Sequence, residues 1–495
     1  MATRLTTILV IVIVGATFIA GLMVGAQRDD ASGPVDLIIV NGKVYPGGGA
    51  ELQEAVAVRG NQILRVGTNR EVKRLRRPQT LVLDAHGGTV IPGLNDGRVQ
   101  LMAGALALDR LDLSSATTID DLETGLLDYA GDASARPWVL ARNADAALLE
   151  NLTVAPRKIL DAAVPERPVF IVSEDGRVAW VNSKALEIAG ITRRTRNPEG
   201  GIVTKDRRTG EPTGVLRDAA IDLVSHMLPR LTRVEKIAAL RAAIDEAHKL
   251  GVTSVHSVTP GEEELDLLST IRKQGELTVR VYGSIAVSPA IGEAEVAELD
   301  KLREAYPDDP TLKLGGVEIT CEKRGPELST CDPAALERAV ALLDKHNWNV
   351  TVRTAGGADV RAAVDAFDHV AVSNPAPRER RYRIDDSLLT DGTARILFGS
   401  NWPAASLDPR DALEEAVATP AELLPAIDAY TAQVAFASHD EQRKGTLKAG
   451  MLADIVILSN NIFDKRPESL RETAVTVTIF DGKIVYQRPA AATDD

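Results

Sequence analysis

The stretch "VIPGLNDGRVQL" (Val90 to Leu101) combines a strand, a turn and a polar segment in twelve residues. Its apolar start predicts a buried strand, and Pro92–Gly93 predicts a turn. Arg98 and Gln100 follow at the place where chemistry would be expected in an enzyme. The rest of the sequence indicates which fold surrounds this segment and whether it supports catalysis.

Both ends of the chain carry β-hairpin patterns. Turn pairs lie between β-rich runs at Asn41–Gly42 in "DLIIVNGKVYPG", at Gly60–Asn61 in "AVAVRGNQILRVG" and at Asp481–Gly482 in "AVTVTIFDGKIVY". Because matching ends usually pair in space, we expect one small β-sandwich assembled from residues 31–93 and 436–495.

The middle of the chain alternates between two patterns. Helical periodicity in "TTIDDLETGLLDYA", "RVEKIAALRAAIDEAHKLG" and "DPAALERAVALLDKHN" is followed each time by an apolar run: "PWVLAR", "VTSVHSV" or "WNVTVRTA". This alternation is typical of a parallel α/β fold. We therefore expect a (β/α)8 TIM-like barrel over residues 94–435, with its chemistry at the carboxyl ends of the strands.

Composition excludes one class of partner. The chain of 495 residues is long enough for a large core and a smaller satellite domain. Its net charge of -13 argues against a nucleic-acid partner, because phosphate binding requires a basic face.

The N-terminus holds an uncharged apolar segment, residues 5–26. It is long for a cleavable signal and fits a membrane-spanning helix, so residues 1–30 are interpreted as an anchor. Val24 and Ala26 leave a cleaved signal as the alternative. Arg4 favours a cytoplasmic N-terminus. The expectation is a single-pass membrane protein whose folded part lies outside the cytoplasm, in the periplasm or the extracellular space.

The only two cysteines are Cys321 and Cys331. In an oxidising compartment they would close a small loop with a disulfide. Two unrelated buried thiols are the alternative, and the spacing is not that of a metal site.

Longer stretches carry a family resemblance. They include "VIPGLNDGRVQL", "AAVPERPVFIVSEDGRVAWVNSKALEIAGI", "GEPTGVLRDAA" and "YTAQVAFASHDEQRKGTLKAGMLADIVIL". The chain after residue 35 resembles the metal-dependent amidohydrolase superfamily, in the branch called amidohydrolase family 3. The resemblance implies hydrolysis of C–N bonds assisted by zinc or another divalent metal. By analogy it also implies a homo-oligomer.

The resemblance also shows where the metal ligands should be, and these positions are altered. The family's His-x-His pair is replaced by Arg98 and Gln100, and the mid-barrel lysine by Glu318. The other altered positions in the barrel are Arg353 in "VTVRTAGG", Asp386 in "RIDD" and Asn401 in "FGSNWP". The stretches from "PWVLARNADAALLENL" to "GEPTGVLRDAA" resemble the family's insert near the substrate, in which "DGH" is frequent and this chain has Arg177 instead of the histidine.

An arginine cannot hold a divalent cation, because it stays protonated and offers no lone pair. We therefore expect no metal and no other cofactor. The two arginines and two carboxylates at these positions have charges that cancel, and buried charges require partners. We predict that they form a salt-bridge network in the former metal site, with Gln100 and Asn401 bonded around it. A collapsed pocket with solvated charges is the alternative.

The remaining histidines do not rebuild a site. Of seven, only His256 in "VTSVHSV" lies near a predicted strand end. We interpret it as a hydrogen-bonded core residue, with a position in the pocket or on a metal as the alternative.

The segment between the "RIDD" and "FGSNWP" motifs is too short for a complete β/α unit. Only 14 residues separate Asp386 from Asn401, so we expect one unit to be missing or reduced and the barrel to be distorted or open. The alternative is that "HVAVSNP" forms the surviving strand.

Three functions remain open. The first is a membrane-anchored pseudoenzyme whose barrel binds or scaffolds an unidentified partner or ligand. The second is an active C–N hydrolase with a non-standard or metal-free site, for which Glu318, Glu322 and Asp386 are the candidate catalytic carboxylates. The third is a binding protein for an anionic small molecule, clamped by Arg98, Arg353 and Arg177. Unpaired barrel arginines would favour the third.

Overall fold

The computed structural model describes residues 34–132, 136–149, 154–259, 261–321, 331–354, 357–374, 379–385, 387–390, 393–464 and 470–489. The expected anchor at residues 5–26, and the candidate carboxylates Glu322 and Asp386, lie outside these ranges. Within the ranges, none of the helices combines the length and hydropathy that crossing a membrane requires.

A β-sandwich is built from both ends of the described chain. Its strands are β1 (Leu37–Val40), β2 (Lys43–Val44), β3 (Ala55–Arg59), β4 (Gln62–Gly67), β5 (Leu81–Asp84), β6 (Thr89–Pro92), β21 (Ile455–Leu458), β22 (Val475–Phe480) and β23 (Lys483–Gln487). One sheet has the order β4-β3-β1-β5 and the other β2-β6-β21-β22-β23. Ile39, Val90 and Ile457 belong to the apolar cluster shared by the two sheets. The pairing of the two chain ends is therefore present, through β6 and β21.

Two of the three expected hairpins form. β3 pairs with β4, and β22 pairs with β23 across Asp481 and Gly482, whose φ angles of 51° and 77° suit a tight hairpin turn. The prediction for Asn41–Gly42 is wrong, because the chain there crosses from β1 in one sheet to β2 in the other. A Cβ on Gly42 would lie 2.8 Å from Cγ2 of Val90, so close packing explains this glycine.

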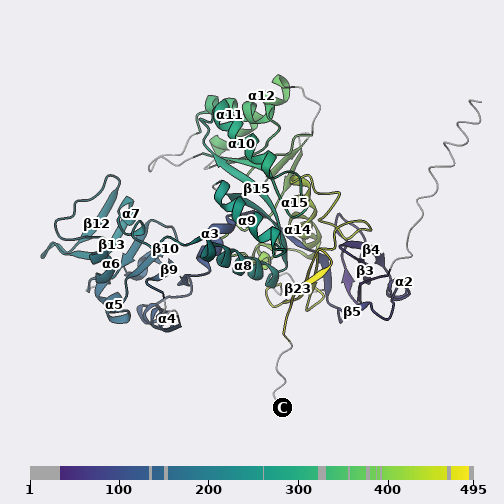
Figure 1. The fold of residues 1–495 in the computed structure, drawn as a ribbon, viewed down its shortest axis with the longest axis horizontal. Coiled ribbons are helices and arrows are strands. Elements are labelled where there is room, and N and C mark those ends of the chain that lie inside the picture. The colour runs from purple at the N-terminus through teal and green to yellow at the C-terminus, as the bar shows by residue number, and fades with distance from the viewer. Residues whose placement is uncertain are drawn as a thin grey trace, which may run out of the picture.

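A parallel half-barrel forms the centre of the molecule (Figure 1). Its strands are β7 (Leu94–Val99), β14 (Val252–Thr259), β15 (Arg280–Val287), β16 (Leu312–Thr320), β17 (Asn349–Arg353) and β18 (Tyr382–Ile384). The helices that precede or connect them are α8 (Arg233–Lys249), α9 (Glu262–Lys273), α10 (Glu293–Ala305), α11 (Pro333–Lys345) and α12 (Gly357–Ser373). Each of these strands is parallel to its neighbour, as the helix–strand alternation predicts.

The barrel is incomplete after β18. Two antiparallel strands, β19 (Ser387–Thr390) and β20 (Thr393–Ile396), follow directly, and no helix lies between β18 and β20 in the described residues. Residues 397–402 then return to β7, where Asn401 N donates to Arg98 O at 2.8 Å. The sheet thus has six parallel strands in the described residues, where the expected (β/α)8 barrel has eight. The alternative strand in "HVAVSNP" is wrong, because His369 to Ser373 end helix α12.

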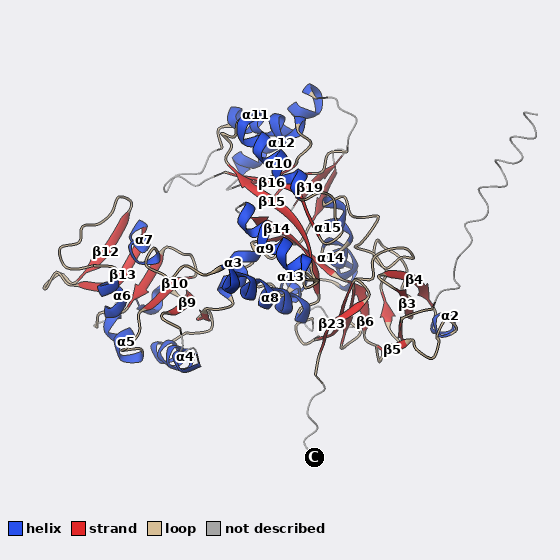
Figure 2. Cartoon of the chain, viewed as in Figure 1, coloured by secondary structure: helices blue, strands red, loops and turns tan. Residues whose placement is uncertain are grey.

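An insert between β7 and α8 forms a separate sheet. Its strands are β8 (Leu111–Asp112), β9 (Val139–Ala144), β10 (Val169–Ser173), β11 (Val178–Val181), β12 (Gly201–Lys205) and β13 (Pro212–Asp218), with α4 (Ile119–Asp132), α5 (Pro156–Ala163), α6 (Ser183–Ile188) and α7 (Asp222–Ser225). It has its own apolar clusters and lies at the opposite end of the molecule from β3 and β4 (Figure 2). The α4–β9 unit belongs to this insert, as the resemblance of "PWVLARNADAALLENL" implies, although its periodicity alone also fits a barrel unit.

The barrel and the sandwich are joined by a buried ion pair. Arg280, at the start of β15, donates to Asp454 at 2.6 and 2.8 Å and to Asp481 at 2.9 Å. The apolar clusters of the described chain are made from Val35 onward. A chain that begins at residue 34 therefore keeps these clusters and is expected to fold.

Short helices complete the described structure: α2 (Asn69–Lys73), α3 (Leu101–Ala107), α13 (Pro409–Ala416), α14 (Leu423–Ala429) and α15 (Ala432–Ala437). Helix α3 directly follows the opening motif and packs against the segment that returns to β7. A Cβ on Gly104 in this helix would lie 2.0 Å from Cε3 of the Trp402 ring.

We predict that Gly104→Ala lowers the free energy of unfolding by roughly 1–3 kcal/mol or more, because the added methyl group displaces the indole. The matched control is Gly125→Ala in α4, where the nearest heavy atom to the new Cβ is 3.6 Å away. The control should raise stability by roughly 0.5–1 kcal/mol through helix propensity. Denaturant unfolding measures both, and equal effects would contradict the close packing.

Candidate functional site

Arg98 lies near the carboxyl end of strand β7 and is buried. Its Nε and Nη2 donate to the two carboxylate oxygens of Glu318, on β16, at 3.0 and 2.7 Å. The side chains of Arg98 and Glu318 are only 10% and 4% exposed. Nη1 donates to Oδ1 of Asn401. Arg98 is therefore hydrogen-bonded to both Glu318 and Asn401, two of the other positions that the family resemblance singled out.

Asp96 fixes the backbone beneath this pair. It is fully buried, and its Oδ1 accepts hydrogen bonds of 3.0 Å from the backbone N–H groups of Arg98 and Ser400. One carboxylate thus connects the end of β7 to the returning segment. Asp96 lies two residues before Arg98 on the same strand, so strand alternation could have identified it.

The second predicted arginine is paired separately. Arg353, at the end of β17, lies 3.4 Å from Asp385, and both side chains are about a third exposed. Asp385 also accepts from Thr354 N at 3.0 Å and from Thr354 Oγ1. Among the described residues no ion pair joins Arg353 to Glu318. The fourth member of the predicted network, Asp386, lies outside the described residues, so the network as a whole stays a prediction. The carboxylate that pairs with Arg353 belongs to Asp385, which directly precedes the predicted Asp386 in the sequence.

A chain of contacting polar side chains inside the barrel, here called the polar column, consists of Arg383, His256, Tyr282 and Asn349. Arg383, on β18, donates to Gly97 O at 3.0 Å and lies 3.5 Å from Nδ1 of His256. The His256 ring is tilted against Tyr282 with centroids 4.8 Å apart, and the Tyr282 hydroxyl accepts from Asn349 at 2.8 Å. The sequence did not single out Arg383. Its place two residues before Asp385 on a strand was the available signal.

Burial sets the protonation of this column. Desolvation, then the positive charge of Arg383, hold the pKa of His256 well below its usual range, so the imidazole is neutral. Burial raises the pKa of Tyr282 to about 12. Neither ring is placed to exchange protons near neutral pH.

The other predicted residues lie elsewhere. Gln100 follows β7 and donates its backbone N–H to Trp402 O at 2.8 Å. Arg177 lies on the insert, where it is 71% exposed and bound to Asp218 at 3.0 Å. The three arginines proposed as an anion clamp thus each have a carboxylate partner.

These residues do not fit a metal. The described residues contain no group of three or more His, Cys, Asp or Glu side chains that could hold one. Both carboxylate oxygens of Glu318 accept hydrogen bonds from Arg98. A guanidinium at that position would repel a dication.

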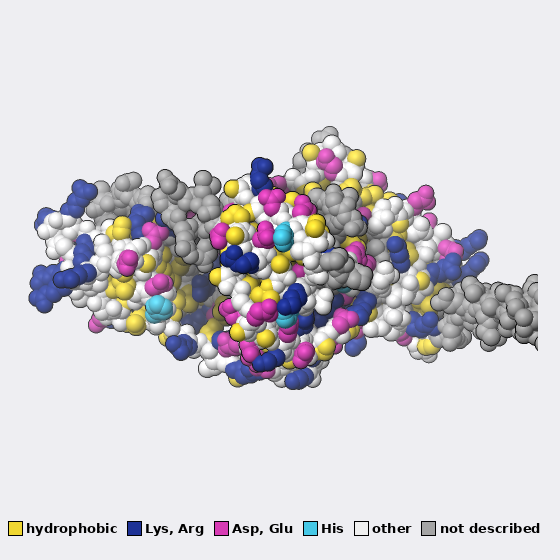
Figure 3. All heavy atoms as spheres, turned by 90° about the horizontal axis from the view of Figure 1, so that it is seen from above, with side chains coloured by type: hydrophobic (Ala, Val, Ile, Leu, Met, Phe, Trp, Pro, Cys, Tyr) yellow, Lys and Arg dark blue, Asp and Glu magenta, His cyan; other side chains and the backbone are white. Residues whose placement is uncertain are grey.

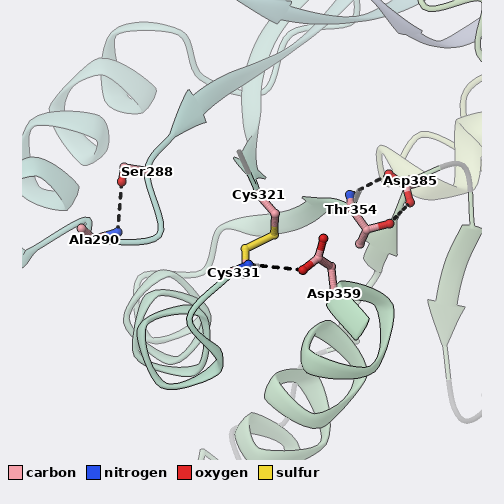
Figure 4. The surroundings of a disulfide bond; sticks show 7 residues. All are labelled: Ser288, Ala290, Cys321, Cys331, Thr354, Asp359 and Asp385. Atoms are coloured by element: carbon pink, nitrogen blue, oxygen red, sulfur yellow. Dashed lines mark hydrogen bonds between the residues drawn. A yellow bond between two sulfur atoms is a disulfide. The ribbon is translucent and has the colours of Figure 1, made fainter. Parts of the chain in front are cut away.

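A disulfide joins Cys321, after β16, to Cys331, before α11 (Figure 4). Cys321 N donates to Arg353 O at 3.1 Å, and Cys331 N donates to Asp359 at 3.2 Å. Of the two interpretations of the cysteines, the bridge is the one that the structure contains. It holds the ends of β16 and β17 beside the start of α11.

A cleft of about 510 Å³ opens between the insert and the barrel. The insert contributes Asp112, Arg142 and Asn143, and the barrel contributes Glu246 and the chain from Trp402 to Asp408. Arg142 is bound to Asp112 at 2.6 Å. Its barrel side starts at Trp402, the residue after Asn401, but Arg98, Glu318 and Asn401 are not among its lining residues.

Comparison with known proteins agrees with this architecture. A family model described as the amidohydrolase family matches residues 81–397 and 387–486. The chain belongs to the amidohydrolase family. "Protein LONG AFTER FAR-RED 3" from Arabidopsis thaliana is 25% identical, over 91% of each chain. "N-substituted formamide deformylase" from Arthrobacter pascens is 22% identical, over 92% of this chain and 98% of its own.

The fold is shared with a solved structure. An uncharacterized metal-dependent hydrolase from Pyrococcus furiosus superposes with a TM-score of 0.65 at 19% identity, over 87% of this chain and 99% of its own.

We predict that Glu318→Gln lowers the free energy of unfolding by roughly 3–5 kcal/mol, because it leaves the Arg98 guanidinium buried without its counter-charge. The double variant R98M/E318L should recover most of this loss, since no buried charge remains. Chemical denaturation measures both.

The matched control is Asp218→Asn, which breaks the exposed pair with Arg177 and should leave stability nearly unchanged. Equal losses in Glu318→Gln and the control would contradict the burial of the Arg98–Glu318 pair.

We also predict a histidine-dependent loss of stability in mild acid. Unfolded His256 takes up a proton below its ordinary pKa of about 6.5, whereas the folded imidazole resists protonation. Stability therefore falls as the pH decreases below that value. His256→Asn should flatten the dependence of the unfolding free energy on pH between about 6.5 and 5. His86→Asn, at a side chain 85% exposed, is the control and should keep the wild-type slope.

Proposed function

We propose that this protein is a metal-free amidohydrolase-fold binding protein, anchored in a membrane by residues 5–26, rather than a metal-dependent hydrolase. The observation that carries the proposal is the bidentate contact of Arg98 with Glu318 at 3.0 and 2.7 Å. A cation-assisted mechanism needs lone pairs converging on an open position. Here the converging groups are a guanidinium and the carboxylate that neutralises it.

The cleft between the insert and the barrel is the surface that would bind a ligand or partner. It combines the buried ring of Trp402 with the paired charges of Asp112 and Arg142. Clefts between domains that combine apolar walls with a few fixed polar groups are common ligand sites. Because Asp112 and Arg142 neutralise each other, this cleft offers no free anion clamp.

A metal-free hydrolase of C–N bonds is the second candidate. Its support is the relative named a formamide deformylase, which aligns over 92% of this chain. Glu318 would have to leave Arg98 to act as a base, and the two other candidate carboxylates, Glu322 and Asp386, lie outside the described residues.

We predict that the purified chain, dialysed against zinc and then against buffer, retains substoichiometric zinc and shows no zinc-dependent rise in its unfolding temperature. A ligand that binds only the folded state raises that temperature, so the two readouts test the same site independently. Elemental mass spectrometry and thermal unfolding measure them.

Stoichiometric zinc together with a thermal shift would contradict the proposal. So would hydrolysis of an N-substituted formamide that survives a chelator and disappears in Glu318→Gln. The second result would establish the metal-free hydrolase instead.

A further inference from the structure

A group of basic side chains covers helix α2 and the turn after it, at the sandwich end of the molecule. Arg70, Lys73, Arg74, Arg76 and Arg77 are all exposed. We call these five residues the α2 basic surface. Figure 3 shows Lys and Arg side chains gathered at this end and at the insert end of the long axis. The chain as a whole carries a charge of -13, so this surface differs in sign from the molecule around it.

The side chains of the α2 basic surface are not paired in salt bridges within the described chain. Glu71, the acid within α2, is bound to Arg65 at 2.7 Å and to the helix N-cap Thr68. Lys73 donates to the amide oxygen of Asn41 at 3.3 Å. Within the described chain, none of the five residues forms an ion pair with a carboxylate.

The surface lies where the chain enters the fold. Val35 packs in the same apolar cluster as Val72 of α2 and Leu75. Thr80, which closes the turn after α2, donates to Val35 O at 2.6 Å. Val35 is nine residues beyond Ala26, the end of the apolar segment. Nine extended residues span at most about 30 Å.

We propose that the α2 basic surface docks on an anionic phospholipid membrane surface. This inference goes beyond the proposed function and takes from it only the anchor at residues 5–26. An anchored chain holds α2 within reach of the lipid headgroups. Clustered Lys and Arg near a bilayer are attracted to its negative surface potential. Arginine, four of the five residues, also binds phosphate oxygens in a bidentate manner. The anchor would thus attach the protein, and α2 would orient it.

The test uses the chain that begins at residue 34, which lacks the apolar segment, so that binding reports on the folded part alone. It is sedimented with vesicles of phosphatidylcholine, or of phosphatidylcholine containing phosphatidylglycerol. We expect binding only to the anionic vesicles, weakened by raising salt. We expect R70Q/K73Q/R74Q/R76Q/R77Q to bind at least about 100-fold more weakly, from the attraction typical of each basic residue.

The matched control is R193Q/R194Q/R196Q/R207Q/R208Q, which removes the same charge from the insert end. It should bind within about threefold of wild type, because its arginines lie far from α2. The proposal is overturned if the chain does not bind anionic vesicles, if the α2 variant binds as well as wild type, or if the control loses as much. Loss of binding in inorganic phosphate at matched ionic strength would also overturn it, since that result indicates a site for free phosphate.

Two further measurements separate the causes of failure. If the α2 variant does not fold, hydrogen exchange of the wild-type chain decides the question: anionic vesicles should protect residues 70–77 and leave residues 193–208 unprotected, and the reverse overturns the proposal. Full-length chain on neutral vesicles tests the anchor by itself. Failure of α2 docking and failure of the anchor are therefore distinguishable.

Discussion

A guanidinium bound to a carboxylate inside the barrel determines most of what this site can do. Two opposite charges that are nearly excluded from water hold each other strongly, because removing either one leaves the other without compensation. Arg98 also belongs to the strand that residues 397–402 return to, where Asn401 N donates to its carbonyl. The same residue thus neutralises Glu318 and closes an incomplete barrel.

The other cations buried inside the barrel are also paired. Positive side chains at several levels of the barrel are each matched with an acid or with a carbonyl dipole: Arg383 with Gly97 O, and Arg280 with Asp454. Lys444, which donates to Ser254 Oγ, has its pKa lowered to about 8 by burial. The buried cations of the barrel are therefore held by fixed partners, and none of these pairings leaves a guanidinium free to receive a ligand anion.

Individual strands, helices and turns were easier to predict from the sequence than the strands with which they pair. The turn at Asp481–Gly482 was predictable because both residues must take positive φ in a two-residue hairpin. Asn41–Gly42 carries the same local signal, but whether the chain returns along one sheet or crosses to another depends on packing against Val90, which is distant in sequence. Likewise α4 and β9 have barrel periodicity, since a helix followed by a strand has the same pattern in either sheet.

In the candidate site, too, the residues could be located from the sequence but their contacts could not. The family motifs located Arg98, Glu318 and Asn401, which do meet. They also indicated Asp386, which lies outside the described residues, whereas the acid seen beside Arg353 is its neighbour Asp385. Asp96 and Arg383 were within reach of period-two reasoning. Their partners are the backbone N–H of Ser400 and the carbonyl of Gly97. Every residue has such backbone groups, so the residue types do not indicate which of them is the partner.

The composite sandwich has a consequence for biosynthesis. Strand β6 is synthesised before the barrel, but its partner β21 leaves the ribosome only after it, and Ile91 pairs with Val456. Until then one side of β6 lacks its neighbour, and the sheet cannot close. Folding of this domain therefore cannot be completed before β21 has left the ribosome. A transcript truncated before β21 would encode the half-barrel strands and still leave an apolar strand edge open to aggregation.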